Sequence, residues 1–319
     1  MKSAWRGWAV MILLLIAAAV LLQRVIASGS QLSWATFRWS PLLVALAATV
    51  VQELLNPWLA KFSLRAIGQD GGYWRLLGIV TTTSASNAVI PLPAGIPLRV
   101  WLQKRWLGIP YADSTLAAVL ESFIGYGVLG LAAILSMVAW APDLLRRTAS
   151  LHSRILFCGT LVMLAVAALC IRLLINRYAP TVVALFRLKR ASRLSWQSLL
   201  AIAAITILGV TLAYVRVVLL GWALSLSALN WGLVFTGLVV SRLAGVASMI
   251  PMGLGARDVS LGYFLVLAGT SASSATAWVI LDRLVMTIPY LMIGLLSMPM
   301  LRKAQQTMGS GSKDSSRVV

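Results

Sequence analysis

The sequence predicts an all-α integral membrane protein of about eight transmembrane helices, with two short broken or re-entrant helices in an inverted repeat. The composition is the first reason: 60% of the residues are hydrophobic and 11% are charged, whereas soluble proteins carry roughly 25% charged residues. The second reason is a succession of apolar runs separated by short polar loops. The third is a pair of similar Pro/Gly clusters that interrupt apolar sequence.

Eight apolar runs have the length or composition of membrane spans. They are residues 8–22, 41–59, 76–90, 116–141, 155–175, 199–220, 231–250 and 276–300. Two shorter apolar pieces, 98–107 and 259–269, follow the Pro/Gly clusters and are too short to cross about 30 Å of hydrocarbon. We expect one membrane domain over residues 1–304 and a disordered tail over 305–319, which is rich in Gly, Ser and charged residues.

The two Pro/Gly clusters resemble each other. IPLPAGIPLR at 90–99 recurs in kind as IPMGLGARD at 250–258. The residues expected to break the helices are Pro91, Pro93, Gly95, Pro97, Pro251, Gly253 and Gly255. A break leaves backbone N–H and C=O groups without helical partners, which the membrane tolerates only inside protein or beside a wet cavity.

The similarity continues beyond the breaks. When LGIPYADSTLAAVLES (107–122) is aligned with LAGTSASSATAWVILDR (267–283), Glu121 matches Asp282. The repeat units are about 76–141 and 231–300. The predicted spans give an odd number of crossings between them, so the two units should run in opposite directions. Inverted repeats with interrupted segments in matching positions indicate a transport site near the membrane midplane.

Charged side chains at membrane depth form the candidate site. They are Arg99, Glu121, Arg242, Arg257, Asp258, Asp282 and Arg283. Guanidinium groups bind phosphate through paired hydrogen bonds, so these arginines would suit an anionic headgroup. Structural ion pairs or arginines that reach the interface explain the same residues. Arg216 is interpreted as an interface marker, and Glu53 either faces a cavity or ends a helix.

The charge distribution favours lipid partners. The net charge is +19. The Lys and Arg side chains lie mainly in loops beside the apolar runs, where they attract anionic lipid headgroups. We therefore expect membrane lipids as partners and no nucleic acid. Lys and Arg are concentrated in the loops that share a side with the two termini, which predicts a cytoplasmic C-terminus.

The sequence offers no catalytic or metal site. His152 has no neighbouring nucleophile, and the cysteines at 158 and 170 lack the spacing of metal ligands. We therefore predict no catalytic residue, no metal and no cofactor, and a protein that is not an enzyme. A membrane transferase that works with carboxylates or arginines alone remains the weaker alternative.

At NAVIPLPAGIPLR (87–99), Glu121, IPMGLGARD (250–258) and LDR (281–283), the chain resembles a flippase-like family related to the membrane region of lysylphosphatidylglycerol synthases. The second unit matches the family pattern better. Ile96 replaces an expected acidic residue, and Ser122 replaces an arginine. The soluble transferase domain of the full synthases has no counterpart here.

The resemblance implies lipid handling in a bacterial cytoplasmic (inner) membrane. The expected function is binding or translocation of an anionic phospholipid or a lipid-linked precursor. A non-transporting membrane partner of a lipid or glycan biosynthetic enzyme is the alternative. Which lipid is handled, its direction, the energy source and the oligomeric state stay open.

Overall fold

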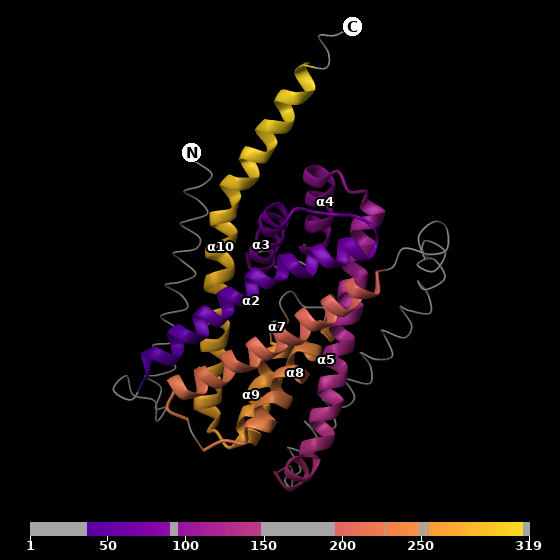
Figure 1. Ribbon diagram of the computed structural model, residues 1–319. Coiled ribbons are helices and arrows are strands. Elements are labelled where there is room, and N and C mark those ends of the chain that lie inside the picture. The colour runs from indigo at the N-terminus through magenta and orange to yellow at the C-terminus, as the bar shows by residue number, and fades with distance from the viewer. Residues whose placement is uncertain are drawn as a thin grey trace. The chain divides into compact units, whose positions relative to one another are not determined.

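The computed structural model describes residues 37–89, 95–147, 195–226, 228–248, 253 and 255–314 (Figure 1). All the regular elements in these ranges are helices: α2 (Trp39–Ala66), α3 (Tyr73–Val89), α4 (Gly95–Leu107), α5 (Tyr111–Arg147), α7 (Trp196–Ala223), α8 (Trp231–Ala247), α9 (Ala256–Ala268) and α10 (Ala272–Asp314). The all-α prediction is confirmed over these residues. The spans predicted at 8–22 and 155–175 lie outside them.

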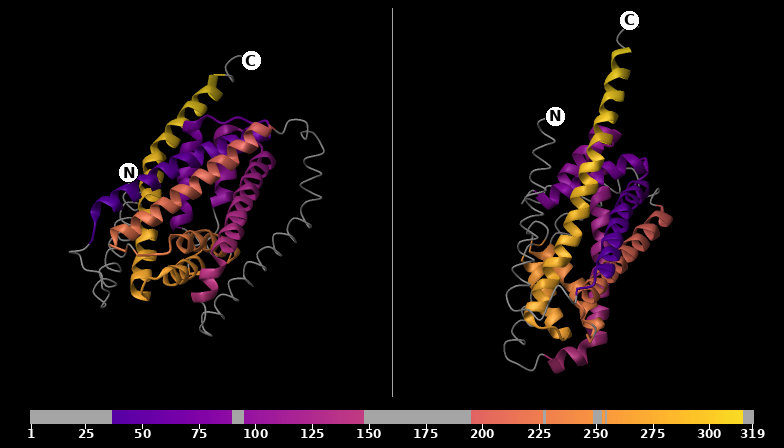
Figure 2. Two further views of the ribbon diagram at one scale, coloured as in Figure 1. Left: turned by 60° about the horizontal axis from the view of Figure 1, so that its bottom comes forward. Right: turned by 90° about the vertical axis from the view of Figure 1, so that its left-hand side faces the viewer.

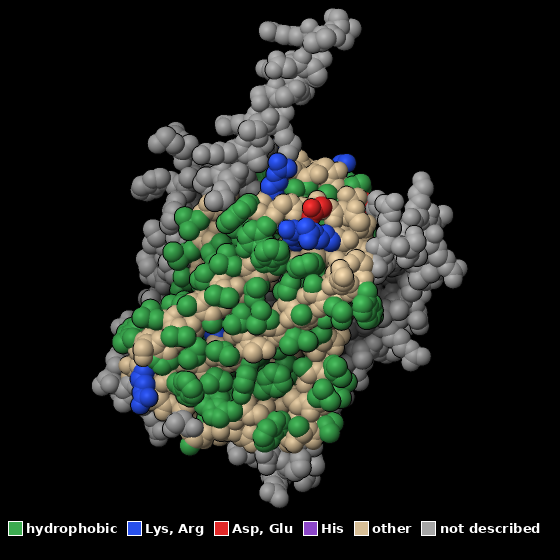
Figure 3. Space-filling view, in the orientation of Figure 1, with side chains coloured by type: hydrophobic (Ala, Val, Ile, Leu, Met, Phe, Trp, Pro, Cys, Tyr) green, Lys and Arg blue, Asp and Glu red, His purple; other side chains and the backbone are tan. Residues whose placement is uncertain are grey.

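Four helices are long and apolar enough to cross a membrane. These stretches are Trp39–Ala66, Tyr111–Trp140, Trp196–Ala223 and Ala272–Gly294. Their surfaces carry exposed apolar side chains, such as Leu43 on α2 and Val138 on α5, and hydrophobic side chains cover much of the described surface seen in Figure 3. Trp39, Trp74 and Trp196 are exposed at or near the first residues of α2, α3 and α7. Tryptophan takes such positions at the membrane–water interface.

The breaks fall where the Pro/Gly clusters predict them. The predicted pieces 98–107 and 259–269 correspond to α4 and α9, each of 13 residues. Pro97 lies in the first turn of α4, where a missing N–H removes no helical hydrogen bond. Pro91, Pro93 and Pro251 lie outside the described residues.

Helix α10 continues to Asp314. The sequence predicts a disordered tail from residue 305, but the described helix includes the first part of that segment. Residues 302–308 (RKAQQTM) consist mostly of strong helix formers. These residues extend the helix before the glycines at 309 and 311 weaken its propensity.

The chain divides into two compact units. Unit 1 comprises Met1–Val50, Gly127–Leu173 and Val210–Pro289, and unit 2 comprises Val51–Tyr126, Leu174–Gly209 and Tyr290–Val319. In unit 1, α8 packs along α9 (Figure 2), and Phe264 of α9 is fully buried. In unit 2, α3 packs against α4, and Leu64, Leu76 and Ala117 form part of the core.

The same succession of helices occurs twice along the described chain, and each long helix begins in one unit and ends in the other. α3 and α8 each have 17 residues, and the short helices α4 and α9 follow them. The long helices α5 and α10 come next, and Glu121 lies as far from the start of α5 as Asp282 lies from the start of α10. The alignment of these two acids in the sequence thus corresponds to equal positions on their helices.

Candidate functional site: an arginine–aspartate cluster beside an apolar groove

Two glycines shape the break between α8 and α9. Gly253 has φ +64° and Gly255 has φ +82°, a backbone region that side chains disfavour. A Cβ atom on Gly253 would lie 2.6 Å from the Cα atom of Gly245 in α8, so the two segments meet backbone to backbone. The N–H of Gly255 donates to Oδ2 of Asp258 at 3.2 Å and caps α9. The break therefore sets Arg257 and Asp258 in the first turn of α9.

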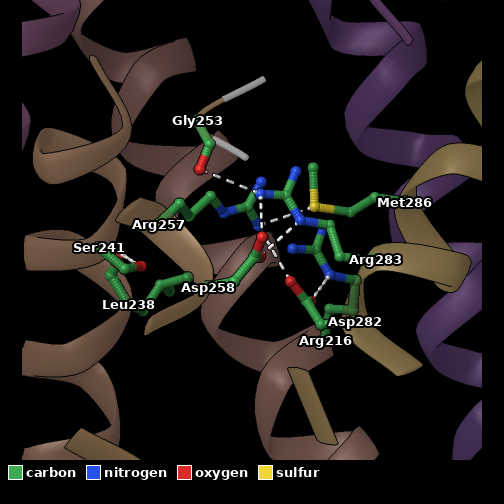
Figure 4. Close-up of polar contacts among 9 residues, drawn as sticks. All are labelled: Arg216, Leu238, Ser241, Gly253, Arg257, Asp258, Asp282, Arg283 and Met286. Atoms are coloured by element: carbon green, nitrogen blue, oxygen red, sulfur yellow. Dashed lines mark hydrogen bonds and ion pairs between the residues drawn. The ribbon is translucent and has the colours of Figure 1, made fainter. Parts of the chain in front are cut away.

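Asp282 of α10 is the buried centre of the cluster (Figure 4). Its Oδ1 accepts from Nε of Arg216 on α7 at 2.9 Å, and its Oδ2 accepts from an Nη atom of Arg257 at 2.9 Å. The side chains of Arg216 and Asp282 are 0% and 2% exposed. One carboxylate at membrane depth thus holds two guanidinium groups. Such burial is tolerable only because both oxygens have charged partners.

A second ion pair lies beside the first. Arg283 donates from Nε to Oδ1 of Asp258 at 2.6 Å and from Nη2 to Oδ2 at 2.9 Å. The same Nη2 lies 3.4 Å from the carbonyl oxygen of Gly253, so Arg283 also contacts the broken backbone. This pair is partly open, with side-chain exposures of 16% for Arg283 and 26% for Asp258. Figure 4 shows this pair beside Arg257, Asp282 and Arg216.

Positive charge exceeds negative charge in this cluster. Arg242 of α8 is half-buried and acts electrostatically on Asp282. Among the described residues, the cluster therefore has four arginines (Arg216, Arg242, Arg257 and Arg283) and two aspartates (Asp258 and Asp282). The cluster carries an excess of two positive charges. The N-terminus of α9 adds the positive end of a helix dipole at the same place.

An apolar groove of about 670 Å³ begins at the open ion pair. It lies between α9 and α10, and its lining includes Asp258, Arg283, Val266, Val279, Ile280 and Leu284. The loop between α9 and α10 is short, so the two helices run back along each other and Asp258 and Arg283 lie at the end away from that loop. Val259, also in the lining, is 67% exposed. The groove is thus charged at one end and apolar along its length.

The corresponding ion pair in unit 2 is simpler. Arg99 of α4 donates from Nη1 to Oε1 of Glu121 at 3.0 Å and from Nη2 to Oε2 at 2.7 Å. The hydroxyl of Ser63 on α2 donates to Oε2 of Glu121 at 3.3 Å. The Asn87 side chain lies directly against the Cα atom of Gly95, where any Cβ would clash. One arginine and one acid balance each other here, so this pair has no excess charge.

Comparison with known families identifies the chain. The model of the lysylphosphatidylglycerol synthase TM region matches residues 6–294, nearly the whole length. The chain belongs to this family. A search of curated proteins finds no significant match to the chain.

For this member of the lysylphosphatidylglycerol synthase TM family, the spans and the family together show a multi-pass membrane protein. The structure brings together Arg257, Asp258, Asp282 and Arg283 in unit 1, and it pairs Arg99 with Glu121 in unit 2. In unit 1, the Arg257–Asp282 and Arg283–Asp258 pairs join the first turn of α9 to the long helix that follows, and the Arg216–Asp282 pair joins α7 to that long helix.

The interpretation of Arg216 as an interface marker is wrong. Its side chain is completely buried and bound to Asp282. Arg216 lies seven residues from the end of α7, near enough for a long side chain to reach the interface. Its position along the helix therefore could not distinguish an interfacial from a buried arginine. The available signal was that Arg216 is the only charged residue within α7, the described span with the highest mean hydropathy, 2.2.

Proposed function

We propose that the chain binds an anionic phospholipid or an anionic lipid-linked precursor in the membrane and translocates it between leaflets. The observation that carries the proposal is the groove between α9 and α10, whose apolar walls end at the Asp258–Arg283 pair. A phospholipid has the same division into a charged headgroup and an apolar tail. Family membership supports a role in lipid handling but specifies none.

The headgroup preference follows from charge. An excess of two positive charges beside the groove favours an anionic occupant, and a guanidinium group binds phosphate through two parallel hydrogen bonds. Arg283 is the arginine that lines the groove and is partly open. Phosphate would therefore compete with Asp258 for Arg283, while the buried Asp282 holds Arg216 and Arg257 in place.

The matched helix lengths and acid positions support a repeat, and we propose that it is inverted because the spans predicted from the sequence give an odd number of crossings between its units. We propose about eight spans, an inner-membrane location and a cytoplasmic C-terminus, following the distribution of Lys and Arg. In this scheme the chain is not an enzyme. Its partners are membrane lipids, and the alternative is a non-transporting membrane partner of a lipid or glycan biosynthetic enzyme.

Lipid exchange in vesicles tests the proposal. The full chain is reconstituted into liposomes that contain fluorescent phosphatidylglycerol, and dithionite bleaching measures how fast labelled lipid leaves the inner leaflet. We expect faster exchange than in protein-free vesicles, and slower exchange with fluorescent phosphatidylcholine. If folded protein leaves the rate at that of empty vesicles, the translocation claim is wrong. If the chain does not exchange lipid and a pull-down finds a stoichiometric enzyme partner, the non-transporting alternative is favoured.

A further inference from the structure

Glu53 lies at the middle of α2, a helix of 28 residues that is long and apolar enough to span the membrane. Its side chain is 0% exposed. By contrast, the acids of the candidate site, Glu121, Asp258 and Asp282, are each bound by an arginine. Glu53 has no ion pair among the described residues. Its carboxyl group instead interacts with the uncharged side chains of Asn56 and Ser84.

The carboxyl group of Glu53 is only half satisfied. Nδ2 of Asn56, one turn further along α2, donates to Oε2 at 2.7 Å. Oε1 is buried and has no hydrogen-bond partner in the part of the chain that the structure describes. An uncompensated carboxylate at membrane depth costs several kcal/mol. The described side chains supply no counter-charge to this carboxyl group, and a bound cation would remove that cost.

Pro57 frees a backbone oxygen of the same residue, Glu53. It lies inside α2 and has no N–H, so it cannot donate the helical hydrogen bond to the carbonyl oxygen of Glu53, four residues earlier. The hydroxyl of Ser84 on α3 faces the Glu53 carboxyl group and provides a third oxygen. Carboxylate, carbonyl and hydroxyl oxygens are the ligands of hard cations, and a carbonyl freed inside a membrane helix is a recurrent ligand of coupling ions.

We propose that Glu53 forms a site for one small monovalent cation, Na⁺ or a proton, at the middle of α2. The carboxylate supplies the charge, and its Oε1 atom, the freed carbonyl oxygen and the Ser84 hydroxyl face the ion. The described residues present only Asn56 and Ser84 to the carboxyl, and neither titrates. The site lies within unit 2 and does not depend on lipid translocation by the groove in unit 1.

Cation binding is measured on the full chain in detergent, without lipid transport. Thermal unfolding is followed in NaCl and in choline chloride at one pH and ionic strength. A Na⁺ site should raise Tm by about 2 °C at about tenfold excess over Kd. The shift should vanish in Glu53→Gln. It should persist in Asp70→Asn, which removes a carboxylate that is 68% exposed on the same unit.

Infrared spectroscopy of the same samples tests whether the bound cation is a proton. A protonated Glu53 gives a carboxylic acid band that Glu53→Gln removes and that disappears from wild-type protein as the pH rises. The proposal is wrong if wild-type protein shows neither a Na⁺-dependent Tm nor such a pH-dependent band. A band that persists unchanged to pH 10 also overturns it, because the proton is then fixed. If Glu53→Gln does not fold, Ser84→Ala should instead weaken Na⁺ affinity about tenfold.

Discussion

Arg283 and Asp258 form a two-point ion pair, with Nε–Oδ1 at 2.6 Å and Nη2–Oδ2 at 2.9 Å, at the charged end of the groove between α9 and α10. Asp258 also caps α9 through the N–H of Gly255. The pair therefore links the broken backbone, the long helix and the groove. A change at either residue should affect the headgroup end of the groove before it affects the buried Asp282.

We expect Arg283→Gln to slow exchange of fluorescent phosphatidylglycerol at least about tenfold, which is about 1.4 kcal/mol of lost interaction. Glutamine keeps a hydrogen-bond donor but loses the charge and the paired N–H geometry. The matched control is Arg65→Gln, which removes a guanidinium that is 44% exposed and bound to Asp70. Equal exchange rates in the two variants would show that Arg283 does not hold the headgroup.

Asp282→Asn should destabilise the protein strongly. It leaves the buried guanidinium groups of Arg216 and Arg257 without the carboxylate that holds both. Loss of one partner from a buried ion pair costs about 3–5 kcal/mol. The measurement is thermal unfolding of the detergent-solubilised chain, with Asp70→Asn as the exposed control. A Tm change no larger than that of the control would mean that water or another group neutralises these arginines.

The sequence predicts the helices well because membrane spans and their breaks depend on local composition. Apolar length defines the spans, and the Pro/Gly clusters locate the starts of α4 and α9 to within a few residues. The predicted residues Arg257, Asp258, Asp282 and Arg283 do come together.

The partners of the charges could not be predicted from the sequence. Whether Arg216 reaches the interface or turns into the protein depends on which face of α7 packs inward, and the helix is apolar on every side. The groove also escaped prediction, because it depends on how α9 and α10 lie along each other. Sequence position alone left Glu53 open between a cavity and a helix end, and only packing shows its complete burial.

Gly253→Ala should destabilise the break between α8 and α9 by about 1–3 kcal/mol. The new Cβ would lie 2.6 Å from the Cα atom of Gly245, and φ +64° is unfavourable for alanine. The control is Gly72→Ala, where a Cβ meets nothing within 4 Å. Thermal unfolding compares the two variants. An unchanged Tm in Gly253→Ala would contradict the close backbone contact.

Gly262→Leu tests the groove without touching the ion pairs. Gly262 lies within α9 and lines the groove, and its added Cβ would meet only Cγ2 of Val279 at 3.8 Å. Leucine is a better helix former than glycine by up to about 1 kcal/mol, so Tm should stay the same or rise. Its side chain would nonetheless occupy space that the proposal assigns to the lipid tail, and exchange should fall at least about tenfold, or about 1.4 kcal/mol.

The matched control is Gly130→Leu on α5, where an added Cβ meets nothing within 4 Å. It places the same side chain on a membrane-spanning helix outside the groove. Fast exchange in Gly130→Leu with slow exchange in Gly262→Leu would assign the effect to the groove. If Gly262→Leu exchanges lipid as fast as wild-type protein, the groove is not on the lipid path, and Arg283 must act on the headgroup from another side.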